Sequence, residues 1–184
     1  MKKLVFLTVC SVAFAISCFA QNNIKGEKGI SSVGVIVGHA VNSKALTVGV
    51  DYRYNIMDRI RLAPSVLYIM KNDLVSSLYA NADVHYLARI TKEVTIYPIG
   101  GLGVSMRSSD IFELKAPSEF DPENPLDIYK TKSDTKTNVG LNLGFGGEMR
   151  LTKDLIIGAE FKYNLTKERI YDQAMLLARL AYYF

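Results

Sequence analysis

Cysteine is almost missing from this chain of 184 residues. The two that are present, Cys10 and Cys18, fall in the first 20 residues, a segment that we expect to be removed. Taking these 20 residues from the 184 leaves 164 residues without a thiol, which excludes disulfide bonds, cysteine metal sites and a cysteine nucleophile together. This length suits one domain, so we expect a leader over residues 1–20 and a single domain over residues 21–184.

The leader has the layout of a secretory signal peptide. It starts with two lysines, continues with an apolar run over residues 4–16 and ends on small residues, which predicts cleavage between Ala20 and Gln21. The apolar run is too short to span a membrane, so a permanent anchor is the weaker interpretation. A second alternative is lipidation of Cys18, since residues 15–18 resemble a lipobox whose first position fits poorly.

Basic clusters and catalytic motifs are also scarce. Removal of the two lysines in the leader lowers the formal net charge from +4 to +2, which leaves no basic patch for nucleic acid. There is no phosphate loop, dinucleotide fingerprint or nucleophile elbow. The chain has two histidines, His39 and His85, and they fall on different predicted strands. We therefore expect no metal, no cofactor and no nucleic-acid partner.

No stretch after the leader approaches the ~20 apolar residues of a membrane-spanning helix. What fills the chain instead is alternation of apolar and polar residues, most clearly over residues 46–56. Because the side chains of a strand point alternately to opposite faces, this pattern predicts strands with one apolar face. The eight predicted strands cover residues 32–39, 46–56, 60–71, 77–88, 94–107, 138–150, 155–165 and 174–184.

Short and long connections alternate between these strands. The short ones are residues 57–59, 91–93 and 152–154, and the longer ones are 40–45, 72–76, 108–137 and 166–172. This asymmetry is typical of outer-membrane barrels, in which the short turns face the periplasm. The sequence therefore predicts an all-β protein, an eight-stranded antiparallel up-and-down transmembrane β-barrel.

The apolar set of each strand is expected to face lipid, and the polar set to face the lumen. Aromatic girdles are expected at Tyr54, Tyr86, Tyr182 and Phe184 near the periplasmic rim, and at Tyr68 and Tyr163 near the outer rim. The inward charges are predicted to form a network of Asp51, Arg53, Arg61, Asp83, Glu148, Glu160 and Arg179. Within it, Glu160 is expected opposite Arg179 as an ion pair. Nine inward glycines relieve crowding, so the predicted lumen is packed rather than open.

Residues 21–184 resemble the small eight-stranded outer-membrane β-barrel family of the OmpA and OmpX type, especially the stand-alone barrels of Bacteroidetes-like Gram-negative bacteria. The resemblance rests on the leader, the eight amphipathic strands, the glycine-rich residues 140–147 and the terminal run Leu180-Ala181-Tyr182-Tyr183-Phe184. That ending resembles the insertion signal read by the outer-membrane assembly machinery. The resemblance implies a Gram-negative outer membrane as the location, and outer-membrane lipid and the assembly machinery, through the strand ending at Phe184, as partners.

The predicted outer loop over residues 108–137 is long, acidic and rich in proline. Proline and charge disfavour extension of the strands, so we expect a solvated projection there. Its candidate interaction residues are Asp110, Glu113, Glu119, Asp121, Glu123 and Asp127. We expect a structural or surface-interaction protein, with a host or cell-surface protein as the further partner, and not an enzyme. A narrow pore is the main alternative; a lipid-modifying outer-membrane enzyme and a soluble ligand-binding barrel are weaker ones.

Overall fold

The computed structural model describes residues 27–72, 75–114 and 129–184, and the side chains of residues 27–70, 75–109 and 134–184. The predicted signal peptide over residues 1–20 lies outside the described residues. So do four of the predicted interaction residues, Glu119, Asp121, Glu123 and Asp127. Asp110 and Glu113 lie in a strand, but their side chains are not among those described.

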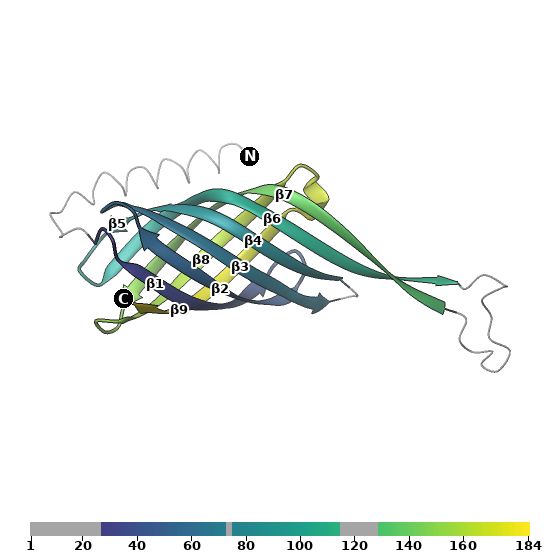
Figure 1. Ribbon diagram of the computed structural model, residues 1–184, viewed down its shortest axis with the longest axis horizontal. Coiled ribbons are helices and arrows are strands. Elements are labelled where there is room, and N and C mark those ends of the chain that lie inside the picture. The colour runs from purple at the N-terminus through teal and green to yellow at the C-terminus, as the bar shows by residue number, and fades with distance from the viewer. Residues whose placement is uncertain (1–26, 73–74, 115–128) are drawn as a thin grey trace.

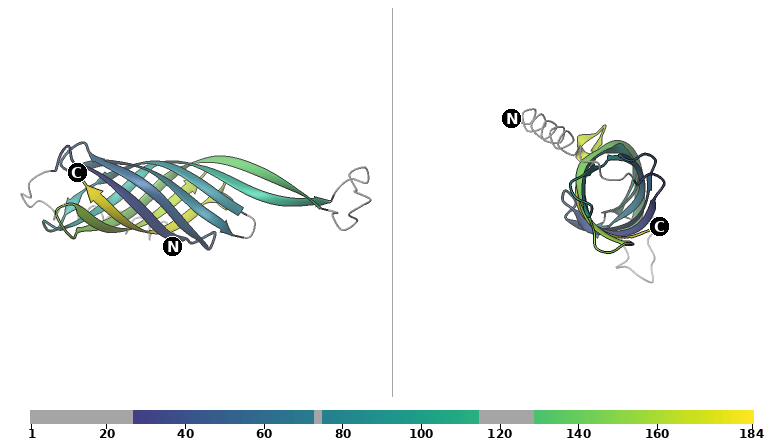
Figure 2. Two further views of the ribbon diagram at one scale, coloured as in Figure 1. Left: turned by 60° about the horizontal axis from the view of Figure 1, so that its bottom comes forward. Right: turned by 90° about the vertical axis from the view of Figure 1, so that its left-hand side faces the viewer.

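The described strands form one antiparallel sheet that closes on itself, as the end-on view in Figure 2 shows. The strands are β1 (Ser31–Ala40), β2 (Ala45–Asn55), β3 (Ile60–Asn72), β4 (Val75–Tyr86), β5 (Ala88–Arg89), β6 (Val94–Leu114), β7 (Tyr129–Arg150), β8 (Leu155–Thr166) and β9 (Gln173–Tyr183). Because β5 is a two-residue stub that continues β4 past Leu87, the barrel has eight full strands. The predicted eight-stranded antiparallel barrel is thus confirmed.

Neighbours in the sequence are neighbours in the barrel. Each full strand pairs with the next, and β9 returns to pair with β1, so the chain runs up and down around the wall (Figure 1). We call the end with the short connections between β2 and β3, β5 and β6, and β7 and β8 the turn end, and the opposite end the loop end. A short 3-10 helix, η2 (Arg169–Tyr171), lies between β8 and β9 at the loop end. Within the described residues, no helix has the length and apolar character needed to cross a membrane.

Two of the three short turns are held by a threonine side chain. Thr91 Oγ1 accepts hydrogen bonds from the backbone N–H groups of the second and third residues after it, at 3.1 and 3.0 Å. Thr152 Oγ1 accepts the matching pair at 3.4 and 3.1 Å. A hydroxyl that satisfies backbone donors in this way favours a turn over continued strand, which explains why these short polar segments reverse the chain.

Exposure alternates along the strands in the predicted sense. In β9, Leu176 and Leu180 are exposed on the outer face, whereas Leu177 and Arg179 are buried on the inner face. The exposed large apolar side chains come from every full strand and form a belt around the barrel. Tyr54, Tyr86, Tyr182 and Phe184 are exposed at the turn end, Tyr68 is exposed near the loop end of β3, and Tyr163 is half-buried near the loop end of β8.

The predicted bounds of the loop over residues 108–137 are wrong, because residues 108–114 and 129–137 lie in strands. β6 continues to Leu114 and β7 begins at Tyr129, and the two strands pair in unbroken register up to these residues. The three prolines that argued against strand extension all fall within residues 115–128, outside the described residues. The arms themselves contain threonine, tyrosine, isoleucine and phenylalanine, which are favoured in strands.

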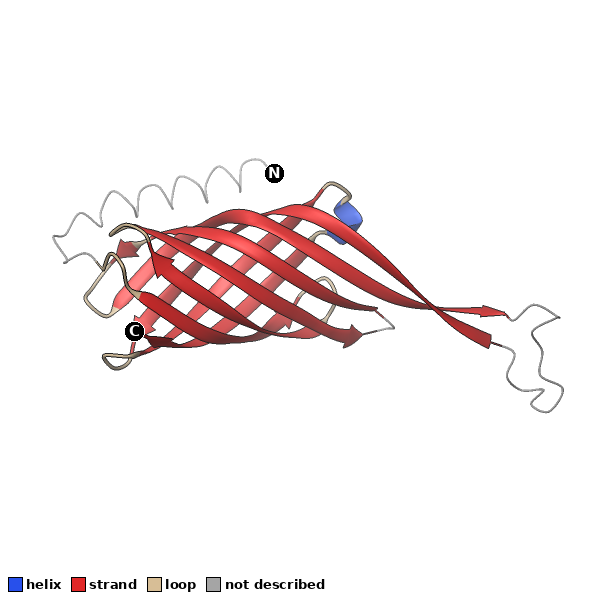
Figure 3. Ribbon diagram, viewed as in Figure 1, coloured by secondary structure: helices blue, strands red, loops and turns tan. Residues whose placement is uncertain are grey.

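This extension projects beyond the barrel. β4 pairs with β6 as far as Ser109, and β8 pairs with β7 from Gly140, so beyond these points β6 and β7 pair with each other alone in the described part of the chain. We call residues 110–114 and 129–139 the β6–β7 ribbon. Figures 1 and 3 show it extending far past the loop end of every other strand.

Val50 tests the assignment of the outer face to lipid. It lies at the centre of β2, and 55% of the residue is exposed. Val50→Arg should lower the free energy of unfolding by about 2–4 kcal/mol, the penalty for a charged side chain on the lipid face near mid-membrane. Val50→Ala, which adds no charge, is the control and should cost much less. Guanidinium unfolding in lipid vesicles measures both, and equal effects of the two changes would contradict the assignment.

Candidate functional site: the barrel lumen

The lumen is filled by three groups of buried side chains, which we call tiers; the first lies toward the turn end, and the second and third lie beside each other nearer the loop end. The first tier is charged and the second is rich in asparagine. The third is apolar and consists of Ile36, Ala40, Ala45, Leu67, Ile69, Tyr79, Met175 and Leu177. Because inward positions recur at every second residue of each strand, each strand contributes to more than one tier.

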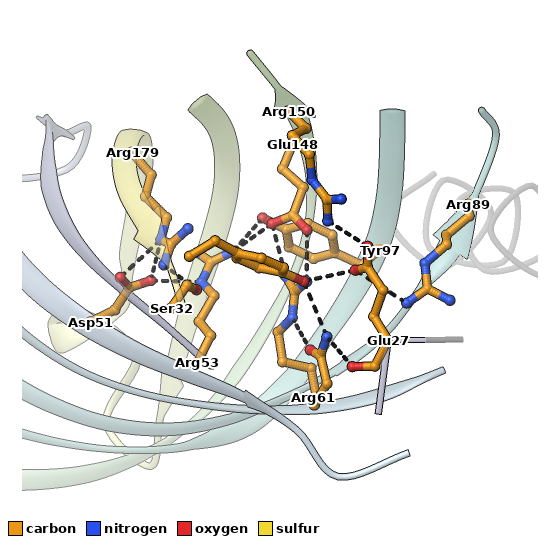
Figure 4. Close-up of polar contacts among 12 residues, drawn as sticks. Glu27, Ser32, Asp51, Arg53, Arg61, Arg89, Tyr97, Glu148, Arg150 and Arg179 are labelled. Atoms are coloured by element: carbon orange, nitrogen blue, oxygen red, sulfur yellow. Dashed lines mark hydrogen bonds and ion pairs between the residues drawn. The ribbon is translucent and has the colours of Figure 1, made fainter. Parts of the chain in front are cut away.

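Arg53 is the hub of the charged tier (Figure 4). Its guanidinium lies 2.6 Å from Asp51 Oδ2, 2.5 Å from Glu160 Oε1 and 3.2 Å from Glu148 Oε2. It also donates a hydrogen bond of 2.8 Å to the hydroxyl of Tyr97. Only 2% of Arg53 is exposed. Three carboxylates around one buried cation compensate the desolvation that would otherwise make burial of a charge costly.

Two further arginines extend this tier to either side of the hub. Arg61 holds both carboxylate oxygens of Glu148, at 2.7 and 2.8 Å, in the bidentate geometry that gives arginine–carboxylate pairs their strength. Arg179 Nε lies 2.7 and 2.8 Å from the two oxygens of Asp51, and its Nη2 donates to Ser32 Oγ at 3.0 Å. Asp51 therefore joins Arg179 to Arg53.

The expected ion pair between Glu160 and Arg179 is a wrong prediction. The register of β8 and β9 places Gly158 opposite Arg179 and sets Glu160 opposite Leu177. A shift of two residues keeps every side chain on its own face, since the period of a strand is two. Alternation alone thus placed both charges correctly in the lumen but could not fix which residues pair.

The second tier joins Asp83 to Lys162 and to a row of amides. Lys162 Nζ lies 2.5 Å from Asp83 Oδ2, and Asn142 Nδ2 donates to Asp83 Oδ1 at 2.8 Å. Asn142 also donates to Asn81 Oδ1 at 2.9 Å and accepts from Asn164 Nδ2 at 2.7 Å. Of the seven predicted network residues, six lie in the first tier and Asp83 lies in the second.

Several residues of the lumen were not singled out from the sequence. Tyr97 is 1% exposed and stacks on His85 with ring centroids 4.6 Å apart. The sequence signal for its inward position was its place between Ile96 and Pro98, two residues that were expected to face lipid. The apolar third tier was also missed. Its signal was the run of apolar residues over 66–70, where both faces of the strand are apolar.

Glycine makes room for these large side chains. A Cβ on Gly146 would lie 2.6 Å from Cε2 of Tyr97 and 2.9 Å from Cγ of Glu160, distances too short for real atoms. The absence of a side chain in β7 therefore lets the ring of Tyr97, from β6, reach the centre of the lumen. Gly100 faces outward and has no atom within 4 Å of its Cβ position, so crowding is a property of the inner face.

The chain matches the family model described as the outer membrane protein beta-barrel domain, over residues 4–184. It belongs to this family. The resemblance inferred from the sequence is thereby confirmed. Among curated protein sequences, none matches this chain.

Solved outer-membrane barrels share the fold. Neisserial surface protein A is 15% identical with a TM-score of 0.62, and the match covers 84% of this chain and 96% of that one. The N-terminal β-barrel domain of Pseudomonas aeruginosa OprF is 15% identical, with a TM-score of 0.58 and coverage of 85% and 98%. Ail, the attachment invasion locus protein of Yersinia pestis, is 15% identical, with a TM-score of 0.53 and coverage of 85% and 99%.

The two histidines of this outer-membrane barrel lie toward opposite ends and on opposite faces of its wall. His85 is buried in the charged tier, where it stacks on Tyr97, whereas His39 is exposed on the outer face near the loop end of β1. Across the described residues, no three histidine, cysteine, aspartate or glutamate side chains are grouped so that they could hold a metal ion.

Substitution of Arg61 tests whether the buried charges of the first tier stabilise one another as ion pairs. Arg61→Met leaves Glu148 with the single, longer contact to Arg53, and should lower the free energy of unfolding by about 3–5 kcal/mol, as expected when one partner of a buried pair is removed. The double variant Arg61→Met/Glu148→Gln removes both charges and should cost less than the sum of the two single changes. Denaturant unfolding measures all three variants. Strictly additive costs would show that the two side chains do not interact.

Proposed function

We propose that this protein is a structural and surface-interaction barrel of the Gram-negative outer membrane, and neither a diffusion pore nor an enzyme. The observation that carries the proposal is the burial of the lumen charges. Arg53, Arg61, Asp83 and Lys162 are each 2% exposed, although they lie in the interior of a barrel. Water reaches the walls of an open channel, and side chains sealed to this degree leave it no continuous path.

The proposed location and partners rest on the family and on the two ends of the chain. In the proposal, the predicted signal peptide exports the chain and is cleaved between Ala20 and Gln21. The strand that ends at Phe184 then engages the outer-membrane assembly machinery, and outer-membrane lipid covers the apolar belt. With this orientation the turn end faces the periplasm and the β6–β7 ribbon stands at the cell surface.

The β6–β7 ribbon supports a surface-interaction role through its unpaired backbone. Eleven residues of β7, from Tyr129 to Val139, pair with β6 on one side and have no strand on the other in the described part of the chain. Such an edge is a template for an added strand from another protein. Ail, one of the structures that share this fold, is an attachment invasion locus protein, and attachment is the class of role that an exposed edge favours.

The base of the ribbon is braced from the neighbouring loop. Arg107 and Lys136 are directly opposite each other in β6 and β7, a like-charge pair that would be unfavourable alone. Tyr171 of η2 relieves it: the guanidinium of Arg107 lies 5.7 Å from its ring centroid, and Lys136 Nζ lies 3.5 Å from its hydroxyl. This brace supports a ribbon held in a set direction relative to the barrel.

Conductance separates the proposal from the pore alternative. Purified protein reconstituted in a planar lipid bilayer should show little steady conductance, because the charged and apolar tiers block the lumen. A general porin in the same bilayer provides the positive control. Large, steady currents whose ion selectivity changes with Glu160→Gln would establish a pore and overturn the proposal.

Replacement of the ribbon tests its independence from the barrel. Ser109 and Asp134 lie opposite each other, so residues 110–133 can be replaced by Asn-Gly, a dipeptide suited to a two-residue hairpin. The shortened protein should still insert and still migrate faster on gels when unheated, since the ribbon pairs with no other strand. Protease added to intact cells should cut the wild type in this region and spare the variant. Protection of the wild type until the outer membrane is opened would invert the proposed orientation.

A further inference from the structure

Residues 27–30 fold across the turn end of the barrel, just before β1. Ile30 N–H donates to the carbonyl of Glu27 at 3.4 Å, which closes a four-residue turn, and Gly29 at its third position has a φ of +84°. A left-handed conformation there favours glycine. Asn55, at the end of β2, fastens the turn: its carbonyl accepts from Gly29 N–H at 2.8 Å, and its side chain donates to the carbonyl of Glu27 at 3.1 Å.

The turn places the carboxylate of Glu27 among polar groups from three separate strands. Arg150 of β7 forms an ion pair with Glu27 Oε1. Tyr183 of β9 donates its hydroxyl to Glu27 Oε2 at 2.7 Å, and Arg89 of β5 lies 3.5 Å from the same oxygen. The guanidinium of Arg150 also lies 4.9 Å from the ring centroid of Tyr183, which holds the two donors beside each other. Figure 4 shows Arg89 and Arg150 converging on Glu27.

The positive charges around the opening of the lumen at the turn end, which we call its mouth, need a neighbouring anion. A small cleft beside Glu27 is lined by the cations Arg89, Lys92 and Arg150. The lining also contains two acids, but Glu148 is already held by Arg61 through both oxygens, and Glu93 is exposed and accepts a hydrogen bond from Thr91. Without Glu27, two guanidinium groups would face each other across a partly buried cleft, where like charges are costly.

We propose that Arg89, Arg150 and Tyr183 form a carboxylate-binding site at the turn end, that Glu27 is its intramolecular ligand, and that this contact closes the mouth of the lumen. The site connects with the charged tier, because Asn55 accepts a hydrogen bond of 2.8 Å from Arg61 while its amide holds Glu27. A molecule with a free carboxylate would occupy the same groups whenever Glu27 leaves them. The proposal does not depend on whether the barrel acts in surface interaction.

A single cysteine reports whether Glu27 closes the mouth. Residues 21–184 contain no cysteine, so Thr95→Cys, in the lining of the cleft, supplies one thiol for maleimide labelling of the folded protein in detergent. Glu27→Ala in this background should raise the labelling rate about tenfold, since charge-assisted hydrogen bonds are the stronger kind. Glu27→Gln keeps the shape and should raise it by a smaller factor. The control Lys28→Gln changes the adjacent, exposed residue and should leave the rate unchanged.

Acetate tests the chemistry of the site. In the Glu27→Ala protein, sodium acetate should slow the labelling, whereas sodium chloride at equal ionic strength should not, and adding Arg150→Gln should abolish the difference. Gel mobility with and without heating checks that each variant is folded, and the Glu27→Gln protein supplies the comparison if Glu27→Ala does not fold. Labelling at the wild-type rate without the Glu27 carboxylate would overturn the closure. Equal effects of acetate and chloride would overturn the carboxylate site.

Discussion

The backbone hydrogen bonds of the strands are the constraint on which the rest of this structure depends. Hydrocarbon offers no partner for a backbone N–H or C=O group, so a sheet in a bilayer must close on itself. Here the pairing of β1 with β9, from Ser32 opposite Tyr183 to Ala40 opposite Met175, removes the last unpaired edge within the barrel wall. Closure with eight strands leaves an interior just wide enough for side chains. The apolar exterior and the packed lumen both follow from that closure.

A packed lumen that contains arginine must compensate each charge inside the protein. Arg53 achieves this with carboxylates from β2, β7 and β8, so one side chain ties together strands that are distant around the barrel wall. A buried network of this kind is weak grounds for extra stability, since desolvation offsets much of the attraction. Its more direct consequence is steric and electrostatic: the hub fills the centre of the lumen, and it cannot move without leaving several charges uncompensated.

The sequence predicted the features that depend on the two-residue period of a strand. It failed for strand register, for the length of the ribbon and for contacts between residues distant in the sequence. Alternation identified the strands and placed Glu160 and Arg179 inside, but a two-residue shift of register changes partners without changing faces, and alternation does not detect it. The β6–β7 ribbon was missed because the prolines of residues 115–128 were read as a property of the whole connection. Glu27 precedes the first strand and has no pattern around it; its role comes from side chains more than 60 residues away, such as Arg89 and Arg150.

Opening the mouth at the turn end would not by itself let ions cross the barrel, because buried side chains still fill the lumen nearer the loop end. Displacing Glu27 would expose the charged tier, yet Leu67, Asn142 and Met175 have no exposed surface and lie between that tier and the loop end. Hydrated ions do not pass a section of the lumen that is filled by buried apolar and amide side chains without a large desolvation cost. If Glu27 closes the turn-end mouth as proposed, its displacement would alter access to Arg61 and Glu148 without moving the buried side chains nearer the loop end. The proposed carboxylate binding at one end of this barrel and the proposed interaction through the ribbon at the other are separated by buried side chains that neither role requires to move.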